Sequence, residues 1–521
     1  MPKRYRRRNR RRPMLVHKAA GTIHPRVQAV GPEHFGVISI DCAKARSKWM
    51  LCDFYGNVLE NPTVVAHDRP QLKAAVTRVQ QVIGEHHLKD ILVAVERTGR
   101  YHRPIQQAFT LAGFDTRTVH PFATKQFRQP ADPGLKTDDR DLAAIHRCAV
   151  NGFALAEAPE EESWRTLKLL VRYRRDLVRK SSALCCQIRE HLEAALPGYA
   201  ACFEKLWTTS GPLQLLRHVT SVQALRQASE AKLKRVLDHH GFRCQERILK
   251  RIVAWAKDAA DSDLAAESHR QIAVALDDDR MRKAQEIQAL ERMISSRLAR
   301  TPYILLLSIV GVNVVSAAEF AGEMGPMHHY PNSRCITGRA GLYPSRYQSD
   351  EVDRPNGPLV RCANRSLRAA ILGVADNLLR CNRHFRIRAA AWKEAGKDPR
   401  GIHVRVGMRF CRMAYQMVGG QQVCRHPAMK DHSWVLQKLL DFHRLHATPA
   451  EQLLEDLQAA IEQLPLKTHR DEAMSLTETL DKIQAGRRRG PQPIGEVLVQ
   501  VLAQLGAKRV QLRKSGVKGP R

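Results

Sequence analysis

Acidic residues are scarce in this chain of 521 residues. Its 52 aspartates and glutamates stand against 85 lysines and arginines, which leaves a formal net charge of +33 and a pI near 10.1. An excess of this size raises the electrostatic potential around the protein and makes nucleic acid the expected partner. A ribosomal or histone-like protein would also be basic, so charge alone does not decide the function.

Long apolar runs and paired cysteines are absent as well. No stretch of eighteen or more apolar residues occurs, so we expect no membrane span. The basic N-terminus lacks the apolar segment of a secretory signal. The twelve cysteines include the adjacent pair Cys185-Cys186 but no Cys-x-x-Cys, which argues against a zinc finger and for reduced thiols in a cytoplasmic protein.

Four carboxylates stand at the ends of predicted elements. The apolar runs 35–40 and 91–95 have the character of buried strands, and they end in Asp41 and Glu96. Asp138 and Asp141 lie three residues apart at the head of a predicted helix and share one face. Carboxylates that close need a shared proton or a cation, and a hard divalent metal suits oxygen ligands. The isolated Asp-x-x-Asp has a plainer alternative, because acids in the first helical turn also suit the cap and the dipole.

These motifs, in this order, resemble the DEDD transposases of bacterial insertion sequences, the family that works as RNA-guided (bridge-RNA) recombinases. The family pattern has strands ending in Asp-x-x-Lys and Glu-x-Thr-Gly, followed by Lys-Thr-Asp-x-x-Asp-Ala. It reads here Asp41-Cys42-Ala43-Lys44, Glu96-Arg97-Thr98-Gly99 and Lys136-Thr137-Asp138-Asp139-Arg140-Asp141, with Leu142 in place of Ala. The resemblance implies an RNase H/RuvC-like α/β domain whose catalytic acids Asp41, Glu96, Asp138 and Asp141 hold Mg²⁺, with Mn²⁺ as the alternative.

A second set of motifs lies in residues 337–368 and resembles the C-terminal domain of the same transposases. Gly341-Leu342-Tyr343-Pro344 matches a Gly-Leu-x-Pro turn, and 363–368 matches a Gly-Asn-x-x-Leu-Arg helix start, with Ala363 in place of Gly. In the family the Ser after this turn is the recombination nucleophile, which by position is Ser349. Asp350 stands where the family has Gly, so Ser345 is a rival candidate.

Cations beside these motifs are predicted to contact nucleic acid. They are Lys44, Lys136, Arg346, Arg365 and Arg368. For Lys44 and Lys136 a purely structural role is the equal alternative. So many cations predict binding that weakens steeply with salt, by roughly a thousandfold or more between low and physiological salt.

The predicted organisation has five parts. They are a basic disordered arm at 1–34, an α/β catalytic domain at 35–155, a helical coiled-coil region with an insert at 156–300, a mainly α-helical serine-bearing domain at 301–424 and a helical extension with a basic tail at 425–521. The α/β domain is predicted to have strands at 35–41, 47–54, 58–66, 90–96 and 114–120, and helices at 69–85 and 102–112.

The middle and the C-terminal parts are predicted to be helical. Leu170, Leu177 and Leu184 recur every seven residues, which favours a coiled coil that joins copies into a dimer or tetramer, with ordinary core packing as the alternative. A second long helix is expected at 266–299. Residues 305–314 read as a helix-hairpin-helix-like unit able to hold a phosphate. Further helices are expected at 433–446, 449–463, 471–486 and 493–505.

We therefore predict a DNA transposase that cleaves and rejoins donor and target DNA with a serine nucleophile, acting on the bacterial nucleoid. The resemblance alone implies a guide RNA, which would read the target by base pairing while the protein reads backbone shape. One alternative is a RuvC-like junction nuclease that uses water as the nucleophile. Another is a non-catalytic basic nucleic-acid-binding protein, for which the acids would be dispensable.

Overall fold

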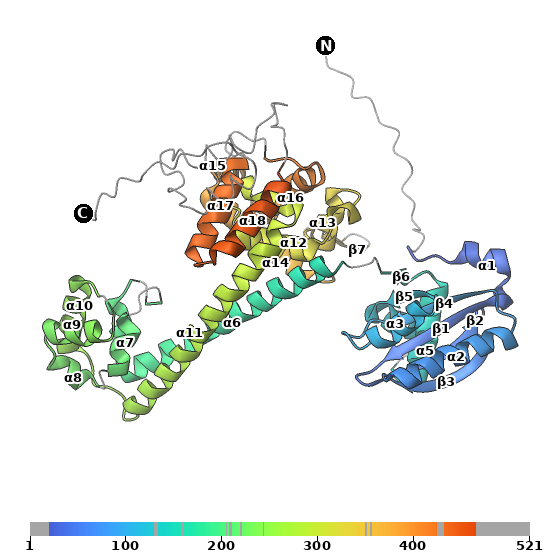
Figure 1. The fold of residues 1–521 in the computed structure, drawn as a ribbon, viewed down its shortest axis with the longest axis horizontal. Coiled ribbons are helices and arrows are strands. Elements are labelled where there is room, and N and C mark those ends of the chain that lie inside the picture. Colours follow the sequence, from blue (N-terminus) through green and yellow to red (C-terminus); the bar gives the residue numbers. More distant parts are fainter. Residues whose placement is uncertain are drawn as a thin grey trace, which may run out of the picture. The chain divides into compact units, whose positions relative to one another are not determined.

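The computed structural model describes residues 20–464, apart from 130–133, 158–160, 205, 208–210, 219–220, 243, 350–351, 355–356 and 425–431. The chain divides into two compact units between Pro159 and Glu160, drawn in Figure 1. Most of the predicted arm (1–19), the predicted helices at 471–486 and 493–505 and the basic tail lie outside the described residues.

A six-stranded sheet forms the centre of the first unit. Its strands lie in the order β3-β2-β1-β4-β5-β6. The bounds are β1 (Phe35–Cys42), β2 (Arg46–Asp53), β3 (Val58–Ala66), β4 (Asp90–Glu96), β5 (Asp115–Val119) and β6 (Ala154–Ala156). Strands β1, β4 and β5 run parallel, whereas β2, β3 and β6 pair antiparallel with their neighbours. This mixed α/β sheet is consistent with the predicted RNase H/RuvC-like domain.

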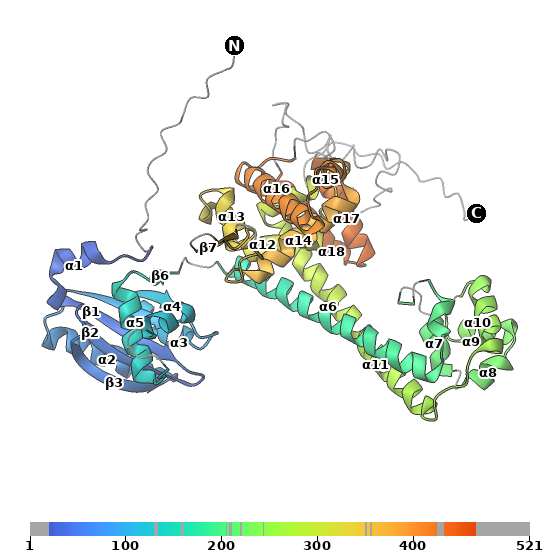
Figure 2. The same cartoon turned by 180° about the vertical axis from the view of Figure 1, so that it is seen from behind.

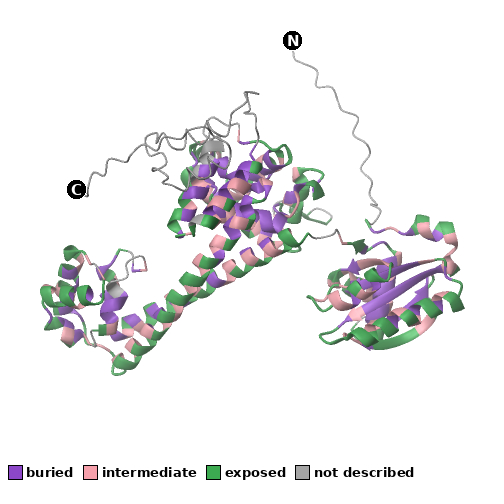
Figure 3. Cartoon of the chain, viewed as in Figure 1, coloured by how far each residue is buried: buried purple, intermediate pink, exposed green. Residues whose placement is uncertain are grey.

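Helices cover both faces of this sheet, as the buried strands in Figure 3 show. They are α1 (His24–Val30), α2 (Arg69–Glu85), α3 (Arg103–Leu111), α4 (Pro121–Arg128) and α5 (Asp138–Val150), with the 3-10 turn η1 (Pro32–His34) before β1. On one face α2 and α3 pack against strand side chains such as Ile40 and Val95. On the other face α5 and α1 pack against Val37 and Leu92. Because both faces are covered, the central strands β1 and β4 are mostly apolar on both of their faces.

The predicted disordered arm is too long. Residues 24–30 form α1, and Ile23 and Val27 are buried against the sheet. The Arg26 guanidinium forms ion pairs with Asp90, at 2.6 Å, and with Asp115. The apolar and paired side chains of this short segment are recognisable only when the sheet edge is present, which explains why the basic composition of 1–34 hid it.

Two antiparallel helices of 34 residues each dominate the second unit, α6 (Glu162–Ala195) and α11 (Ala266–Ala299). Figures 1 and 2 show them side by side along most of their length. Arg174 Nε of α6 donates to Glu291 Oε1 of α11 at 2.6 Å, and nearer the other end the Nδ1 atoms of His191 and His269 lie 2.8 Å apart. Leu177 and Leu184 are buried as the heptad pattern requires, while Leu170 is only partly buried.

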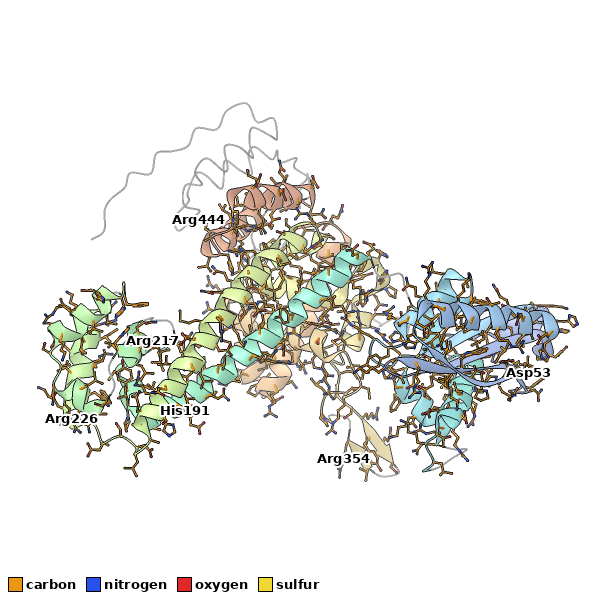
Figure 4. All side chains as sticks on the ribbon, turned by 60° about the horizontal axis from the view of Figure 1, so that its bottom comes forward. Asp53, His191, Arg217, Arg226, Arg354 and Arg444 are labelled. Carbon is orange, nitrogen blue, oxygen red and sulfur yellow. The ribbon has the colours of Figure 1, made fainter. Side chains whose placement is uncertain are left out.

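A small helical insert with its own core sits at one end of this helical pair. Its helices are α7 (Gly211–His218), α8 (Val222–Arg226), α9 (Glu230–His239) and α10 (Glu246–Asp258), preceded by the 3-10 helix η2 (Tyr199–Cys202). The core includes Tyr199, Leu225, Leu237 and Ile252. His191 of α6 and Arg217 of α7, labelled in Figure 4, mark the place where the insert joins the pair.

The rest of the second unit is built around a larger core, with an exposed hairpin outside it. Its elements are η3 (Pro302–Ser308), α12 (Val314–Met324), η4 (Met327–His329), α13 (Ser333–Arg339), the hairpin β7 (Tyr347–Ser349) and β8 (Val352–Arg354), α14 (Arg365–Cys381), α15 (Arg383–Glu394), α16 (Pro399–Gly419), α17 (His432–Leu445) and α18 (Ala450–Glu462). Parts of α6 and α11 contribute to the same core, and so do α17 and α18.

The predicted helix-hairpin-helix-like unit differs from the expectation in its first half. Residues 302–308 form a helix as expected, but it is a 3-10 helix, and its side chains from Tyr303 to Ser308 are all buried. The turn at Gly311, with φ +102°, and the start of α12 at Val314 are as predicted. Asn313 and Ser316 cap α12 reciprocally, so the Asn313 and Ser316 amide N–H groups at its N-terminus already have hydrogen-bond acceptors.

None of the helices in the described part of the chain is both long and apolar enough to cross a membrane.

Candidate active site

Two of the predicted acids lie next to each other at one edge of the sheet. In the parallel pair β1 and β4, Ile40 is in register with Val95, so the next residues, Asp41 and Glu96, leave the two strands at the same level. Both side chains belong to half-buried residues, whereas the strand positions before them are fully buried. The strands therefore fix the backbone of both acids while leaving their carboxylates partly accessible.

Helix α5 supplies the other two acids. Thr137 caps the helix, its hydroxyl accepting a hydrogen bond from the Arg140 amide at 3.4 Å. Asp138 is exposed, while Asp141, one turn on, is only 5% exposed. Because α5 packs on β1 and β4 through residues such as Ile145, its first turn lies beside the strand ends.

The acids of the three elements interact electrostatically. Burial raises the pKa of Asp41, and the negative charges of Asp141 and Asp138 raise it further. Burial, followed by the charge of Asp41, raises the pKa of Glu96 to about 7. The nearby Lys136 opposes both shifts. Such mutual repulsion is relieved when a cation joins the cluster.

The donor chemistry of this cluster suits a divalent metal ion. Carboxylate oxygens are the ligands that Mg²⁺ and Mn²⁺ prefer. The thiols of Cys42 and Cys148 lie near these acids, but burial raises their pKa values and keeps them protonated. In the part of the chain that the structure describes, no three acidic, histidine or cysteine side chains already converge on one ion position. The side chains of the cluster would therefore have to rotate to coordinate a metal together.

Arg128 provides a cation at the most buried acid. Its guanidinium, at the end of α4, forms an ion pair with Asp141 Oδ1, and the two side chains are 14% and 7% exposed. The pair is thus shielded from solvent on both sides. Nothing in the sequence marked Arg128, because it lies thirteen residues before Asp141 and outside the family motifs.

The remaining predicted residues of this unit are placed around the acids. Lys44 and Lys136 are exposed. Asp139, between the two predicted acids, forms an ion pair with Lys48 of β2 at 2.5 Å. Asp139 therefore already has a cation partner and, at 60% exposure, lies on the surface, unlike the buried Asp141.

The hairpin of β7 and β8 carries Ser349. Ser349 is exposed and pairs with Val352 across the two short strands. Among the described residues no hydrogen bond engages its hydroxyl. Arg346 forms a two-pronged ion pair with Asp353 across the hairpin, at 3.0 and 2.7 Å, which ties the strands together. Arg354, labelled in Figure 4, marks the second strand.

Ser345, the rival candidate, is part of the neck of this hairpin. Its hydroxyl and its amide both donate to the Pro358 carbonyl at 2.9 Å, and the Gly357 amide donates to the Ser345 carbonyl at 3.0 Å. A Cβ at Gly357 would lie 2.5 Å from Ser345 Oγ, so the two backbone segments of the neck approach each other as closely as glycine allows. The hydroxyl of Ser345 therefore has a structural partner.

Arg368 holds the base of the segment that carries Ser349. Its guanidinium donates to the Ala340 carbonyl at 2.8 Å and to the Val360 carbonyl, one on each side of the segment. A Cβ at Gly341, where φ is +62°, would lie 2.5 Å from this guanidinium. The structure thus gives Arg368 an intramolecular role, although the sequence predicted a nucleic-acid contact. Arg365 is exposed.

A buried acid that the sequence did not indicate supports the same region. Glu323 of α12, with no exposed side-chain area, accepts two hydrogen bonds from Arg172 of α6 at 2.7 and 2.8 Å. Asn364, which caps α14, donates to it at 3.2 Å. Burial alone would raise the pKa of Glu323, but the hydrogen bonds and charge of Arg172 hold it below its usual value. The partners are far apart in sequence, so no local pattern reveals them.

Two models of known protein families match the segments that contain the four acids and the hairpin. A model of the DEDD transposases of IS110 type, described as "Transposase", matches residues 38–197, which include all four acids. A second, described as "Transposase IS116/IS110/IS902 family", matches residues 303–389, which include the hairpin with Ser349. The search of curated proteins finds no match. The chain therefore belongs to the DEDD transposases of the IS110 type and is a DNA transposase.

Proposed function

We propose that this transposase cleaves and rejoins DNA with Ser349 as its nucleophile, supported by a divalent metal ion that Asp41, Glu96, Asp138 and Asp141 hold. The observation that carries the proposal is the contrast between the two serines. Ser349 is exposed on the hairpin with no hydrogen bond from a described residue, whereas the Ser345 hydroxyl is bound to Pro358. A nucleophile must be free to reach its target, which favours Ser349.

The proposed reaction is a reversible exchange of phosphate esters. Ser349 Oγ bonds to the scissile phosphorus, the bond from phosphorus to one deoxyribose oxygen breaks, and the proton of the serine ultimately serves the leaving hydroxyl. The attached strand conserves the bond energy, so the hydroxyl of another strand can displace the serine and rejoin the backbone without ATP. A bound Mg²⁺ or Mn²⁺ would neutralise charge on the phosphate and favour the ionised hydroxyl.

The test is the formation of a covalent protein–DNA adduct. Purified protein, labelled donor and target DNA, RNA from the element's flanks and Mg²⁺ are combined, and wild type is compared with Ser349→Ala, Ser345→Ala and Asp138→Asn. We expect a protease-sensitive adduct with wild type and Ser345→Ala, and none with Ser349→Ala or Asp138→Asn. Thermal unfolding of each variant shows whether it is folded.

Two other results would each overturn part of the proposal. An adduct that persists in Ser349→Ala and disappears in folded Ser345→Ala would move the nucleophile to Ser345. Strand cleavage without any adduct, retained in both serine variants and lost in Asp138→Asn, would show that water attacks, as in a RuvC-like nuclease.

The family resemblance and the charge of +33 support guidance by RNA. We expect an RNA of defined sequence to co-purify with the protein, and cleavage of target DNA to stop after ribonuclease treatment and resume when that RNA is returned. Reaction at the same DNA sequence without RNA would exclude guidance. The proposed place of action is the nucleoid in the cytoplasm, with Lys44, Lys136 and Arg365 as exposed candidates for nucleic-acid contacts.

The paired helices α6 and α11 support self-association through a coiled coil. Large apolar side chains are exposed along them, although α6 and α11 already pack on each other. These are Leu169, Tyr173, Val178, Ile272, Met281 and Met293. Light scattering of the purified protein is expected to give a dimer or tetramer, and replacing Leu169, Ile272 and Met293 with Gln is expected to shift it toward the monomer.

A further inference from the structure

The helices α15 and α16 carry a concentration of positive charge that the predicted contacts do not include. Between residues 383 and 419 there are nine arginines and lysines and only two carboxylates, Glu394 and Asp398. Asp398 caps α16, its carboxylate accepting hydrogen bonds from the Arg400 and Gly401 amides. The cations are Arg383, Arg386, Arg388, Lys393, Lys397, Arg400, Arg405, Arg409 and Arg412.

An aromatic ring organises part of this charge. The guanidinium carbons of Arg388 and Arg409 each lie 5.4 Å from the ring centroid of Trp392, one from α15 and the other from α16. Trp392 itself is partly buried against the larger core. A guanidinium stacked on an aromatic ring loses less freedom when it binds, and its N–H groups keep the planar fork that matches a phosphate. The ring thus presents two arginines in fixed positions.

The charge of this surface lacks an internal counterpart. Burial lowers the pKa of Arg409, and the neighbouring charges of Arg388 and Arg412 lower it further. Within the described residues none of the nine cations forms an ion pair with a carboxylate. On α6, by contrast, Arg172, Arg174 and Arg175 each bind a glutamate. Crowded like charges destabilise a fold unless an anion joins them, so the surface is suited to an external polyanion.

We infer that α15 and α16 form a binding surface for the backbone of duplex DNA, in which Arg388, Arg409 and Arg412 contact phosphates and Trp392 positions the first two. Two guanidiniums cover the Trp392 ring, so the ring is not offered to an unpaired base, as it would be on a single-strand platform. The inference rests on the proposed function only in taking DNA as the substrate, and it requires neither the metal nor the serine.

The test measures DNA binding without catalysis. The full chain is titrated with a fluorescent DNA duplex in EDTA at several salt concentrations, and wild type is compared with the triple variant Arg388→Gln, Arg409→Gln, Arg412→Gln. Each lost phosphate contact lowers the slope of log K against log salt by about 0.9, so we expect a slope smaller by about two to three and at least roughly tenfold weaker binding at low salt.

The matched control removes the same charge where it is already neutralised. Arg78→Gln, Lys180→Gln and Arg282→Gln together remove three cations that form ion pairs with Glu60, Asp176 and Asp279. This control is expected to bind DNA within about twofold of wild type with a nearly unchanged slope. If the two triple variants behave alike, the surface on α15 and α16 has no special role and the inference is wrong.

Substitutions at Trp392 separate positioning from charge. Trp392→Leu changes no charge but removes the ring, and we expect several-fold weaker binding to DNA, with Trp392→Phe restoring most of it. Circular dichroism and thermal unfolding of each variant report whether it is folded. Equal DNA binding by wild type and folded Trp392→Leu would remove the positioning role.

Parallel titrations with RNA distinguish the occupant. A loss in the α15–α16 triple variant that appears with duplex or single-stranded RNA but not with duplex DNA would overturn the assignment to DNA. Ser349→Ala is expected to retain the wild-type slope, because it removes no phosphate contact of this surface. Failure of the nucleophile proposal would appear in the adduct assay alone, and failure of this inference in the slope alone.

Discussion

Single residues of the first unit show two ways of burying negative charge beside other negative charges. Glu96 has no cation in direct contact among the described residues, and burial together with Asp41 raises its pKa to about 7. Asp141 is more deeply buried but is bound by Arg128. The Arg128 guanidinium thus does for one acid what a metal ion would do for the cluster, and a metal ion that used Asp141 as a ligand would compete with Arg128.

Replacing Arg128 with Gln is therefore expected to strengthen metal binding. The change removes the competitor from Asp141 and leaves a buried carboxylate that needs a cation, so affinity for Mn²⁺ should rise by about tenfold, or ~1.4 kcal/mol. Isothermal titration of the DNA-free protein with Mn²⁺ measures it. Asp141→Asn, which removes a proposed ligand, should weaken Mn²⁺ binding. Weaker Mn²⁺ binding by Arg128→Gln would mean that Arg128 positions Asp141 for the metal instead of competing with it.

The acids could be proposed from the sequence because each lies at the start or the end of an element with a strong local pattern. Arg128 and Glu323 could not, because their partners Asp141, Arg172 and Asn364 become neighbours only through the fold. The same limit applies to Arg368, whose two carbonyl partners reveal a structural role that its motif did not suggest. Local sequence patterns predict the element on which a side chain lies. Its contact partners depend on how the elements pack together, which these patterns do not show.

At the scale of elements, prediction succeeded where one hydrophobic period runs through a whole segment. The strands observed at 35–42, 46–53, 58–66 and 90–96 begin and end within a residue or so of the expected positions, and α11 spans the expected 266–299. The 3-10 helix η3 was expected only as a helix, because an apolar run that is buried on all sides has no period to distinguish a 3-10 helix from an α-helix. Helix α1 was missed because it is only seven residues long and lies in a basic segment, so it shows too little of a hydrophobic period.

Two ion pairs of α6 are expected to differ in how much they stabilise the protein: the buried Arg172–Glu323 pair with α12 and the exposed Lys180–Asp176 pair. Arg172→Met removes the main counter-ion of fully buried Glu323, and since Arg172 itself is 46% exposed we expect a loss of about 2 kcal/mol in the free energy of unfolding. Lys180→Met removes an exposed pair with Asp176, which solvent screens, so the loss should be far smaller. Urea titrations of the two variants measure the losses. Equal losses would show that the Glu323 pair adds no more than a surface pair.

Helices α17 and α18 meet α11 at a buried histidine, which predicts acid sensitivity. His443 lies 3.0 Å from Thr448 Oγ1, and its Nε2 is 3.4 Å from Ser295 Oγ and from Asp456 Oδ2. Burial, and then the charge of His446, lowers the pKa of His443 to about 4. The folded state therefore binds fewer protons than the unfolded state between about pH 6.5 and pH 4, and stability is lost as the pH falls through this range.

The expected loss from His443 is roughly 3 kcal/mol, the equivalent of moving its pKa from about 6.5 to about 4. His443→Gln does not titrate, so its free energy of unfolding should fall less between pH 6.5 and pH 4. Asp456, whose pKa burial raises, and Arg300, which binds Asp456, face the same site. Both are present in wild type and variant, and the difference between the two pH profiles therefore reports His443. Parallel profiles would contradict the prediction.

At the scale of the whole molecule, the sequence did not reveal where the positively charged surface lies or how far the core extends. The basic composition indicated a nucleic-acid partner, but three arginines of α6 bind internal glutamates, whereas among the described residues none of the nine cations of 383–419 pairs with a carboxylate. Net charge therefore predicts the class of partner without locating its surface. The extent of the core is likewise not visible from family motifs. The family match ends at residue 389, whereas the larger core includes residues as far as Leu464.

Residues 435–464 are part of the larger core, although the sequence suggested only an extension there. Val435, Leu439, Leu440, Leu457 and Ala460 are at most 2% exposed. Each buried leucine contributes about 1.5–3 kcal/mol. A chain that ends at residue 424 would lose all of these contacts, which together approach the whole stability of a typical domain, about 5–15 kcal/mol.

We therefore expect the chain ending at 424 to aggregate or to unfold without a cooperative transition, whereas the full protein unfolds cooperatively. Expression yield and thermal unfolding of the truncated chain and the full protein measure the difference. If the chain ending at 424 melted cooperatively within a few degrees of the full protein, α17 and α18 would be a peripheral addition. The expected result would instead make them part of the scaffold that supports the hairpin with Ser349, since both pack on the same core as α12 and α14.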